Sequence, residues 1–430
     1  MVTLIVKDNF NIFINEETGR WFCFDYILEN RIIKDINIET IKDLYCNYKE
    51  FEFYLNEIKK DIEPINDRLD DLNYLILHTS DLCNMRCLYC YAEDNLCNNN
   101  NNCSIMSADT MIKSINKFYK GKDFFVLFHG REPLTNYDNI LKTVKEFKNE
   151  KKIHFIVQTN GMLLNDKKIK ELRKYNITIN VSIDGISDFS NGLRINGLET
   201  LNYTSRVKEL IEKYKISPII IIHKNNYNEI EEIMDYLIKY NIEGASFNFL
   251  WPTRENKELS KYILSGDILF ETMKKVFDKS IVDSKFIFKE RELYLLYGRI
   301  LKRHINNYMC NRAPCGGGKN CLSVYMDGEI YPCTMVNNQK ENYLGNLDNT
   351  IEEILDKDII LKRRDINSIK DCCTCPLRIF CKGGGCPGFI YNYSMNIDEK
   401  SLYCEYYYEI ILYIIKKIYK MSEEKYFINY

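Results

Sequence analysis

The sequence lacks long hydrophobic runs, and neither sign of charge is in excess. None of its 430 residues lies in a run of 18 apolar residues, the length needed to cross a bilayer. The opening residues, MVTLIVKDNFNIF, do not combine a charged start, an apolar core and a small-residue cleavage site, as a secretory signal would. The 59 Lys and Arg nearly balance the 61 Asp and Glu, which gives no indication of nucleic acid as a partner. We therefore expect a cytoplasmic protein whose partners include no membrane and no nucleic acid.

Cysteine, by contrast, is abundant, with 17 in the chain. Cytosolic thiols stay reduced, so without a secretory signal these cysteines favour bound metal over a disulfide scaffold. Two groups stand out, at 83–90 and 310–404, and residues 104–309 contain no cysteine. The remaining composition, with 45% hydrophobic residues, 28% charged residues and only 8 prolines, is that of a folded protein with a sizeable core.

Six apolar, strand-like runs alternate with lysine-rich segments that carry apolar residues at helical spacing. The runs are 72–80, 124–130, 152–160, 177–184, 217–224 and 244–250. This alternation predicts repeated strand–helix units around parallel strands. A barrel, which would take up about 250 residues by itself, and a doubly wound sheet both fit the pattern.

The segments on either side of this region are predicted to be separate units. Residues 1–70 contain two strand-like runs, VTLIVKDN and RWFCFDYI, followed by a helical stretch at 38–62, which predicts a small α+β unit. The apolar stretch at 406–420 contains Glu409 and three lysines, so we expect an amphipathic helix docked on the protein. The asparagine-rich insert at 95–104 has no periodicity and is predicted to be a loop.

Three cysteines follow the first predicted strand directly, at Cys83, Cys87 and Cys90, with the spacing C-x3-C-x2-C. An iron–sulfur cubane takes one thiolate per iron, so three ligands leave one iron open to a small molecule. Zinc is the alternative, but structural zinc fills four positions and catalytic zinc prefers histidine and carboxylate ligands. No histidine lies within this motif, so the spacing favours an iron–sulfur cluster.

Polar or glycine-bearing loops also follow the next three predicted strands: HGREPL, QTNG and SIDG. The carboxyl ends of parallel strands lie at one edge of a barrel or sheet, where active sites collect. We therefore expect these loops and the cysteine triplet to meet at one rim.

The triplet, with Tyr89 just before its last cysteine, and the GREP loop after the second strand resemble the radical S-adenosylmethionine (SAM) superfamily. The resemblance implies an α/β fold with a partial (β/α)6 TIM barrel, in which a [4Fe-4S] cluster binds SAM and a 5′-deoxyadenosyl radical is generated. It also implies SAM-binding residues on the strand-end loops. These are Tyr89, Gly130, Arg131, Glu132, Gln158, Asn160, Ser182 and Arg194. One departure is Arg131, which replaces the second glycine of the family's GGEP loop, and we expect its side chain to point away from SAM.

The downstream cysteines resemble those of a SPASM domain, the C-terminal extension of many radical SAM enzymes. Eight cysteines can close two four-ligand clusters, although a pair of zinc ribbons would have similar spacings. The resemblance implies that one auxiliary [4Fe-4S] cluster is held by Cys315, Cys321, Cys333 and Cys386, and a second by Cys372, Cys375, Cys381 and Cys404. An extra glycine separates Cys381 from Cys386, and Cys373 is the candidate for a swapped ligand.

The other cysteines are not predicted to bind metal. Cys23 and Cys46 are expected to pack as small hydrophobic residues in the N-terminal unit. No role is assigned to Cys97, Cys103 or Cys310.

Radical SAM enzymes with SPASM domains modify peptides, oxidise sulfatase active sites or, in smaller classes, dehydrogenate alcohols. Sulfatase maturases carry an aspartate base after the YPC cysteine, where this chain has Thr334, and a hydroxyl is a poorer base than a carboxylate. The N-terminal unit is similar in outline to winged-helix units that bind the leader of a precursor peptide as an added strand.

The resemblance thus implies a maturase of cysteine-rich ribosomal peptides that joins a cysteine sulfur to a carbon in a thioether. Its partners would be the precursor peptide and a flavodoxin- or ferredoxin-type electron donor. The implied domains are a leader-binding unit at 1–70, a radical SAM barrel at 71–300 and a SPASM domain at 301–430. Carbon–carbon crosslinking, epimerisation, sulfatase-type oxidation and a non-enzymatic iron–sulfur redox protein are the alternatives.

Overall fold

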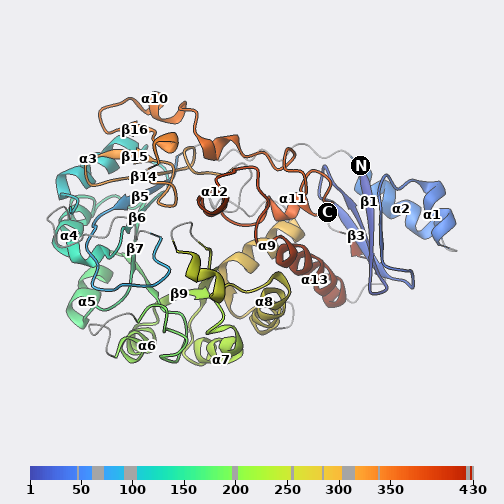
Figure 1. Ribbon diagram of the computed structural model, residues 1–430, viewed down its shortest axis with the longest axis horizontal. Coiled ribbons are helices and arrows are strands. Elements are labelled where there is room, and N and C mark those ends of the chain that lie inside the picture. The colour runs from blue at the N-terminus through green and yellow to red at the C-terminus, as the bar shows by residue number, and fades with distance from the viewer. Residues whose placement is uncertain are drawn as a thin grey trace.

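The protein consists of a curved β/α barrel, a C-terminal region that extends its sheet, and a separate N-terminal sheet (Figure 1). The computed structural model describes residues 1–45, 48–60, 72–91, 104–195, 202–252, 256–282, 285–302, 315–337, 339–422 and 427–428. The asparagine-rich insert up to residue 103, Cys46, Cys97, Cys103 and Cys310 lie outside the described residues.

Six parallel strands form the barrel and follow one another in chain order, as the sequence predicts. They are β5 (Tyr74–His78), β6 (Phe124–His129), β7 (Ile153–Thr159), β8 (Thr178–Ser182), β9 (Ser217–Ile222) and β10 (Gly244–Phe249). Each pairs with the next in parallel register. A doubly wound sheet would reverse its strand order part-way, so this consecutive order selects the partial barrel.

Helices cover the outer face of the barrel. They are α3 (Ala108–Phe118), α4 (Tyr137–Glu146), α5 (Asp166–Lys174), α6 (Tyr203–Tyr214), α7 (Ile230–Lys239) and α8 (Gly266–Ser280). Helix α3 buries Met111, Ile115 and Phe118 at helical spacing, which turns one stripe of its surface toward the core. Helix α5 is capped by Asn165, whose side chain accepts a hydrogen bond from the backbone of Lys168.

The C-terminal region continues the barrel sheet beyond β5. Strand β14 (Cys321–Val324) pairs in parallel with β5, and β15 (Glu329–Tyr331) and β16 (Gly345–Asn346) follow in antiparallel order. At the other edge, β13 (Lys289–Glu290) pairs with β10. Cysteines of the C-terminal field are thereby placed directly beside the first barrel strand.

Short elements complete the C-terminal half. The helices are α9 (Arg291–Lys302), α10 (Ile351–Leu355), α11 (Arg378–Cys381), α12 (Pro387–Ser394) and α13 (Cys404–Ser422). A two-stranded ribbon is formed by β11 (Ile281–Val282) and β12 (Lys285–Phe286). Single turns of 3₁₀ helix span Pro133–Asn136, Tyr227–Glu229, Lys257–Tyr262, Lys340–Asn342 and Ile360–Arg363. Among the described helices, none is long and apolar enough to cross a membrane.

The N-terminal unit is a five-stranded antiparallel sheet with two helices on one face. The strands, in spatial order, are β17 (Phe427–Ile428), β3 (Trp21–Asp25), β2 (Phe10–Asn15), β1 (Val2–Lys7) and β4 (Arg31–Ile33), and the helices are α1 (Ile38–Leu44) and α2 (Tyr48–Lys59). The sequence predicts only two of these strands and a single helix. The sequence does not predict strand β2. In the structure, Asp8 and Asn9 both have positive φ and form the two-residue turn of a tight hairpin between β1 and β2.

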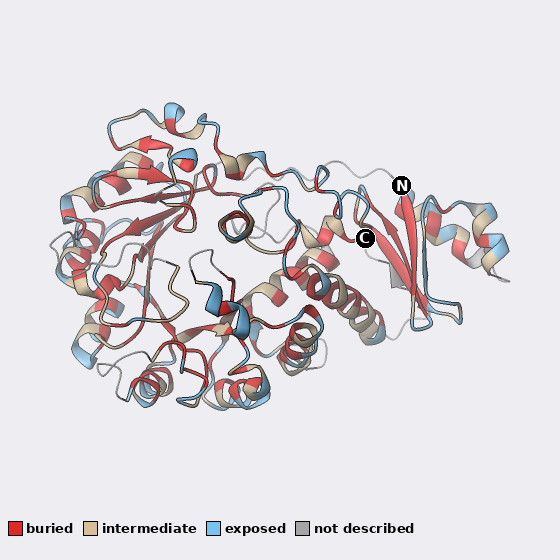
Figure 2. Ribbon diagram, in the orientation of Figure 1, coloured by how far each residue is buried: buried red, intermediate tan, exposed pale blue. Residues whose placement is uncertain are grey.

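Helix α13 covers the other face of the N-terminal sheet, as the predicted docking of 406–420 requires. Its side chains share a buried cluster with Phe10, Ile12 and Trp21 of the sheet, and the indole nitrogen of Trp21 donates to the carbonyl of Ile300, 3.0 Å away. Figure 2 shows β1, β2 and β3 of this sheet coloured mainly as buried, whereas the edge strand β4 is largely exposed. The N-terminal sheet therefore shares its core with the rest of the protein.

Candidate functional site

The cysteine triplet lies in the loop that leaves the carboxyl end of β5, and its thiols are partly buried. Burial raises the pKa of the Cys83 thiol to about 11 and that of Cys87 to about 12, and the charge of Cys90 contributes to both increases. Charges act on one another in this way only at short range, so Cys90 lies within electrostatic range of both other thiols. The backbone N–H of Met85 donates to Cys83 Sγ over 3.4 Å, which fixes the start of the loop.

The GREP loop after β6 is bound directly to the cysteine loop. The backbone N–H groups of Arg131 and Glu132 donate to the carbonyls of Ser80 and Leu82 at 3.0 and 3.1 Å. Gly130 has a φ of 121°, and a Cβ at this position would lie 2.7 Å from the carbonyl oxygen of Ser80. Only glycine permits this backbone conformation and this approach.

Glu132 fixes the end of β6 to the end of β7. Its fully buried carboxylate accepts hydrogen bonds from Thr159 Oγ1 at 2.7 Å, from the backbone of Asn160 at 2.8 Å and from the backbone of Leu134 at 3.0 Å. Burial raises the pKa of Glu132, and these three hydrogen bonds oppose that increase. The Glu132 carboxylate is therefore bonded to the protein's own loops.

Asn160, held by Glu132, extends to the cysteine loop. Its Nδ2 donates to Asn84 Oδ1 at 2.8 Å and lies 3.9 Å from Cys83 Sγ. The ends of three strands, β5, β6 and β7, are thus joined by hydrogen bonds around the thiols, at the one rim that the sequence predicts.

The other predicted contacts lie around β7 and β8. Gln158 is half-buried on the barrel's inner face, in register with Asn180 of β8. Ser182 ends β8 and its carbonyl accepts a hydrogen bond from the Tyr203 hydroxyl. Arg194 donates through Nε to Asp184 Oδ1 at 3.0 Å, and the Tyr89 hydroxyl donates to Asp184 Oδ2.

The YPC loop of the C-terminal region meets the cysteine loop through Tyr91. The Tyr91 hydroxyl lies 3.0 Å from His129 Nδ1, and burial raises the pKa of Tyr91, while a hydrogen bond with Thr334 and the charge of Arg131 oppose the increase. The Arg131 side chain is half-buried and lies near Tyr91. Nearby, the ring of His78 stacks on Tyr325 with 4.3 Å between centroids.

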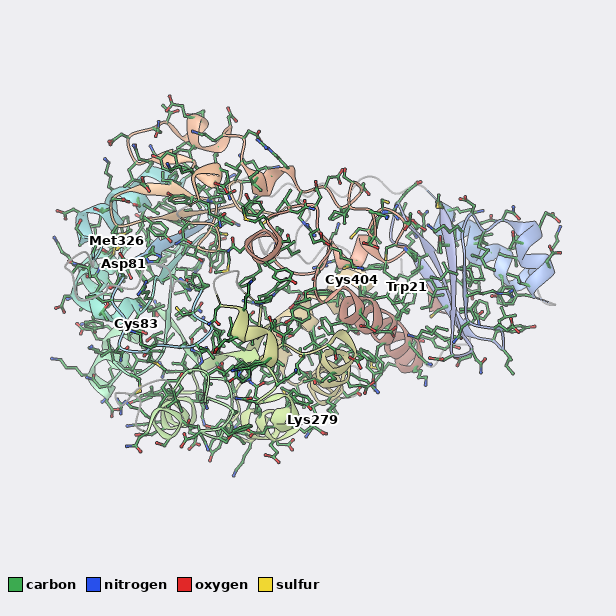
Figure 3. The ribbon with its side chains drawn as sticks, in the orientation of Figure 1. Trp21, Asp81, Cys83, Lys279, Met326 and Cys404 are labelled. Carbon is green, nitrogen blue, oxygen red and sulfur yellow. The ribbon has the colours of Figure 1, made fainter. Side chains whose placement is uncertain are left out.

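Four of the eight downstream cysteines form one electrostatic group. Burial raises the pKa of Cys381, and the charges of Cys404, Cys375 and Cys372 raise it further. Cys404 begins α13, and Figure 3 shows it on the opposite side of the molecule's centre from Cys83. The assignment of these four residues to the second auxiliary cluster stays a prediction.

The remaining downstream cysteines lie around the loop of Pro332 and Cys333. A Cβ on Gly317 would lie 3.3 Å from Pro332 Cβ and 3.6 Å from Cys315 Sγ, and one on Gly388 would lie 2.8 Å from Met335 Cβ and 3.6 Å from Cys386 Sγ. Cys315 and Cys386 therefore approach the same loop from two sides. Cys373 is exposed and its thiol donates to the carbonyl of Lys370, and Cys23 is fully buried in β3.

These donor sets fit iron–sulfur clusters, because each consists of thiols alone. A cubane binds one thiolate on each iron, so a set of three would leave one iron open to a ligand, whereas a set of four would leave none. The polar strand ends fit a small polar ligand at that open position.

Comparison with known proteins agrees with this geometry. The radical SAM superfamily model matches residues 77–237, which contain the triplet and the GREP, QTNG and SIDG loops. The model of the SPASM iron–sulfur cluster-binding domain matches residues 315–376. The chain carries a radical SAM domain followed by a SPASM domain.

Relatives with these domains are enzymes. The cysteine-type anaerobic sulfatase-maturating enzyme of Clostridium perfringens is 26% identical over 369 residues, which cover 81% of this chain and 97% of the relative. The radical SAM cyclopropyl synthase TigE of Paramaledivibacter caminithermalis is 26% identical over 433 residues, covering 92% of this chain and 85% of the relative. The solved structure of native anSMEcpe with bound AdoMet and Cp18Cys peptide has a TM-score of 0.67 at 23% identity, covering 82% of this chain and 100% of that chain. The protein is thus a radical SAM enzyme, with SAM and iron–sulfur clusters as its cofactors.

Sequence reasoning missed two residues of the radical SAM domain, Asp184 and His223. Asp184 is the acidic residue of the SIDG loop, and His223 directly follows β9 at the same rim. Both are fully buried. Their position after a strand was visible in the sequence, but the direction of their side chains was not.

Proposed function

We propose that this protein is a radical SAM peptide maturase that joins a cysteine sulfur to a carbon of a ribosomally made peptide. The observation that carries the proposal is the cysteine loop at the rim of a parallel barrel, where Asn160 donates to Asn84 and lies 3.9 Å from Cys83 Sγ. In the proposal Cys83, Cys87 and Cys90 hold a SAM-binding [4Fe-4S] cluster. The eight cysteines of the SPASM region hold two more clusters in the two sets described above.

The barrel rim would bind and orient SAM. Bound beside a reduced cluster, SAM supplies a carbon-centred radical that removes a hydrogen atom from the substrate. Arg194 offers a guanidinium to a carboxylate or to ribose hydroxyls, while Asn160, Gln158 and Ser182 offer amide, hydroxyl and main-chain groups. The Glu132 carboxylate positions Asn160 and does not contact the ligand itself.

A peptide substrate is supported by the relatives. One matures sulfatases, and the solved structure with the shared fold holds a peptide together with AdoMet. We assign leader binding to residues 1–70, the radical SAM barrel to 71–300 and the SPASM domain to 301–430. The expected edge requires one correction: β1 is an interior strand, and the edge of β3 is paired with β17. The outer strands of the described sheet are β17, of two residues, and β4, and we assign the added strand to β4, where Ile32 is half exposed.

The thioether would form by net removal of one hydrogen from carbon and one from sulfur. One electron remains after the carbon radical couples with sulfur, and we assign it to the auxiliary clusters, with a flavodoxin- or ferredoxin-type protein as the electron donor that reduces the first cluster. Thr334 supports this reaction over sulfatase-type oxidation, because its hydroxyl is a poorer base than a carboxylate.

Sulfatase-type oxidation is the second candidate, because a relative with that activity matches along 97% of its length. The two reactions differ in the fate of sulfur. A thioether keeps the cysteine sulfur and loses two hydrogens, whereas conversion of cysteine to an aldehyde removes the sulfur. Intact-mass spectrometry of the product peptide separates them.

The test uses protein reconstituted with iron and sulfide without oxygen. We expect about twelve irons per chain and release of 5′-deoxyadenosine from SAM with dithionite, and we expect Cys83→Ala to abolish that release. Incubation with the cysteine-rich peptide encoded beside the gene should then lower the peptide mass by two hydrogens. Bound zinc in place of iron, or no 5′-deoxyadenosine from the fully loaded protein, would overturn the proposal.

A further inference from the structure

Asp184 is a fully buried carboxylate that none of the roles above uses. Its Oδ1 accepts hydrogen bonds from Arg194 Nε at 3.0 Å and from the backbone of Ile221 at 3.1 Å, and its Oδ2 accepts one from the Tyr89 hydroxyl. The three donors come from the loop after β8, from β9 and from the cysteine loop. One side chain therefore joins three separate parts of the rim.

The main chain of Asp184 is fixed as firmly as its side chain. Its N–H donates to Asn191 Oδ1 at 2.8 Å, and its carbonyl accepts from Asn226 Nδ2 at 2.6 Å. A carboxylate held at both its backbone and its oxygens has little freedom to follow a moving partner. The groups that donate to this carboxylate, Arg194 and Tyr89, are therefore held in the positions that it fixes.

Arg194 depends on this carboxylate for its charge balance and its orientation. Its side chain is 9% exposed, and a buried guanidinium requires a counter-charge. Its guanidinium also lies over the Tyr89 ring, 5.4 Å from the centroid, a cation–π contact. Among the described residues, only Nε of this guanidinium donates to a protein acceptor, so Nη1 and Nη2 remain available to a ligand.

The charge of Arg194 lies near the cysteine triplet. Burial raises the pKa of Cys87, and Arg194 opposes that increase. The hydroxyl that binds Asp184 belongs to Tyr89, which stands between Cys87 and Cys90 in the chain. Tyr89 of the cysteine loop and the Arg194 guanidinium both donate to the Asp184 carboxylate, and these two hydrogen bonds set the distance between the triplet and the guanidinium.

His223 adds a fourth group on the same carboxylate. Its ring is fully buried, and Nδ1 accepts a hydrogen bond from the backbone of Asn225 at 3.2 Å, so the ring proton is assigned to Nε2. That nitrogen lies 3.6 Å from Asp184 Oδ2 and has no hydrogen-bond partner. Burial would raise the pKa of Asp184, but Arg194, His223 and Tyr89 together hold it below its ordinary value.

We propose that Asp184 is a positioning residue that holds Arg194 and Tyr89 in one arrangement, so that the free Nη groups of Arg194 bind the carboxylate or ribose of SAM beside the triplet. This rests on the proposed function, because it requires SAM at that rim. His223 supports the carboxylate from the side opposite the ligand groups and does not touch SAM. The class of ligand recognised is an anionic or polyhydroxyl group of a small molecule.

The test measures SAM affinity without turnover. Anaerobically reconstituted protein with oxidised clusters is dialysed against SAM, and bound SAM is counted for wild type, Asp184→Asn, Arg194→Lys and Tyr89→Phe. Asparagine removes the counter-charge and turns an N–H toward Tyr89, so we expect Kd to rise roughly tenfold or more for Asp184→Asn and for Arg194→Lys. Tyr89→Phe removes one hydrogen bond and should raise Kd by a smaller factor.

The matched control is Glu290→Gln. Glu290 is also a buried carboxylate, 1% exposed, that accepts hydrogen bonds from the backbones of Phe247 and Leu293, but it lies at the far edge of the barrel sheet. We expect it to leave the Kd for SAM unchanged. The double variant Asp184→Asn with Arg194→Lys should be little worse than either single variant, because both disturb one contact.

The outcomes separate this inference from the proposed function. Wild-type affinity in Asp184→Asn, with weakened binding in Arg194→Lys, overturns the inference and leaves the proposed function intact. A fully loaded wild type that binds no SAM overturns both. If Asp184→Asn fails to fold, Tyr89→Phe decides, since it removes only a hydroxyl, and an unchanged Kd in that variant counts against the arrangement. Uncoupled SAM cleavage should show a raised KM with kcat within about twofold of wild type, as loss of ground-state binding requires.

Discussion

Replacing Glu132 by glutamine should weaken the hydrogen bonding at the end of β7 while every residue of β7 stays unchanged. The carboxylate accepts three hydrogen bonds, two on Oε1 and one on Oε2. Glutamine keeps one acceptor oxygen, which can retain Thr159 and Leu134, but its NH₂ then faces the backbone N–H of Asn160. One buried donor is left without an acceptor, at a cost of about 1–3 kcal/mol.

Hydrogen exchange measures this loss where it occurs. The Asn160 amide should exchange about 5- to 150-fold faster in Glu132→Gln than in wild type, since 1–3 kcal/mol corresponds to that range. Because Asn160 also donates to Asn84 beside Cys83, the variant should lose iron faster to a chelator. Glu146→Gln makes the same chemical change at an exposed position of α4 and should alter neither property. Unchanged exchange of the peptide containing Asn160 would refute the assigned role of Glu132.

Three further predictions follow from other contacts. Burial raises the pKa of Glu290 to about 7, so protonated Glu290 contributes fully to stability below about pH 4.3, and this contribution is lost as pH rises through 7. Denaturation of the wild type should therefore give a free energy of unfolding about 3 kcal/mol lower at pH 8 than at pH 5. This difference should be absent in Glu290→Gln. Cys83→Ala and Cys404→Ala should each lower the iron content from about twelve to about eight per chain. Only Cys83→Ala should abolish release of 5′-deoxyadenosine. Equal loss of 5′-deoxyadenosine in the two variants would contradict the division of roles between the clusters. Arg378 pairs with Glu16, whose side chain is 2% exposed, so Arg378→Met should destabilise the protein by about 3–5 kcal/mol and the double variant with Glu16→Gln by less, as measured from unfolding midpoints.

The barrel could be predicted from the sequence because its signals are local. Each buried parallel strand is a short apolar run, and each covering helix repeats apolar residues at helical spacing. The polar loops at the strand ends were also visible, and with parallel strands they could only meet at one rim. The structure confirms the six strands to within a few residues at their ends.

The N-terminal sheet was harder to predict because its pairing is not local. Strand β4 has only three residues, and β3 pairs on one side with β17, which lies at the far end of the described chain. No local pattern connects two such segments. The interior position of β1 follows from that pairing and was therefore not predictable from its own residues.

In the site, the sequence identified residue types but not their directions. The main chain around Glu132 was expected to face the ligand, but the sequence did not indicate that the Glu132 carboxylate faces Thr159 and the backbone of Asn160. Asp184 gave no signal beyond an acidic residue after a strand, and its importance comes from a tyrosine and an arginine that reach it from two other loops. Such convergence depends on tertiary packing, which spacing alone does not specify.

The cover that α13 and β17 give to the N-terminal sheet has a consequence for biosynthesis. Chains begin to fold from their first residues as they leave the ribosome, but one apolar face of this sheet packs against α13 and the edge of β3 pairs with β17, which are both synthesised long after it. We expect the sheet to stay incomplete, and open to chaperones, until the helix that begins at Cys404 has been synthesised.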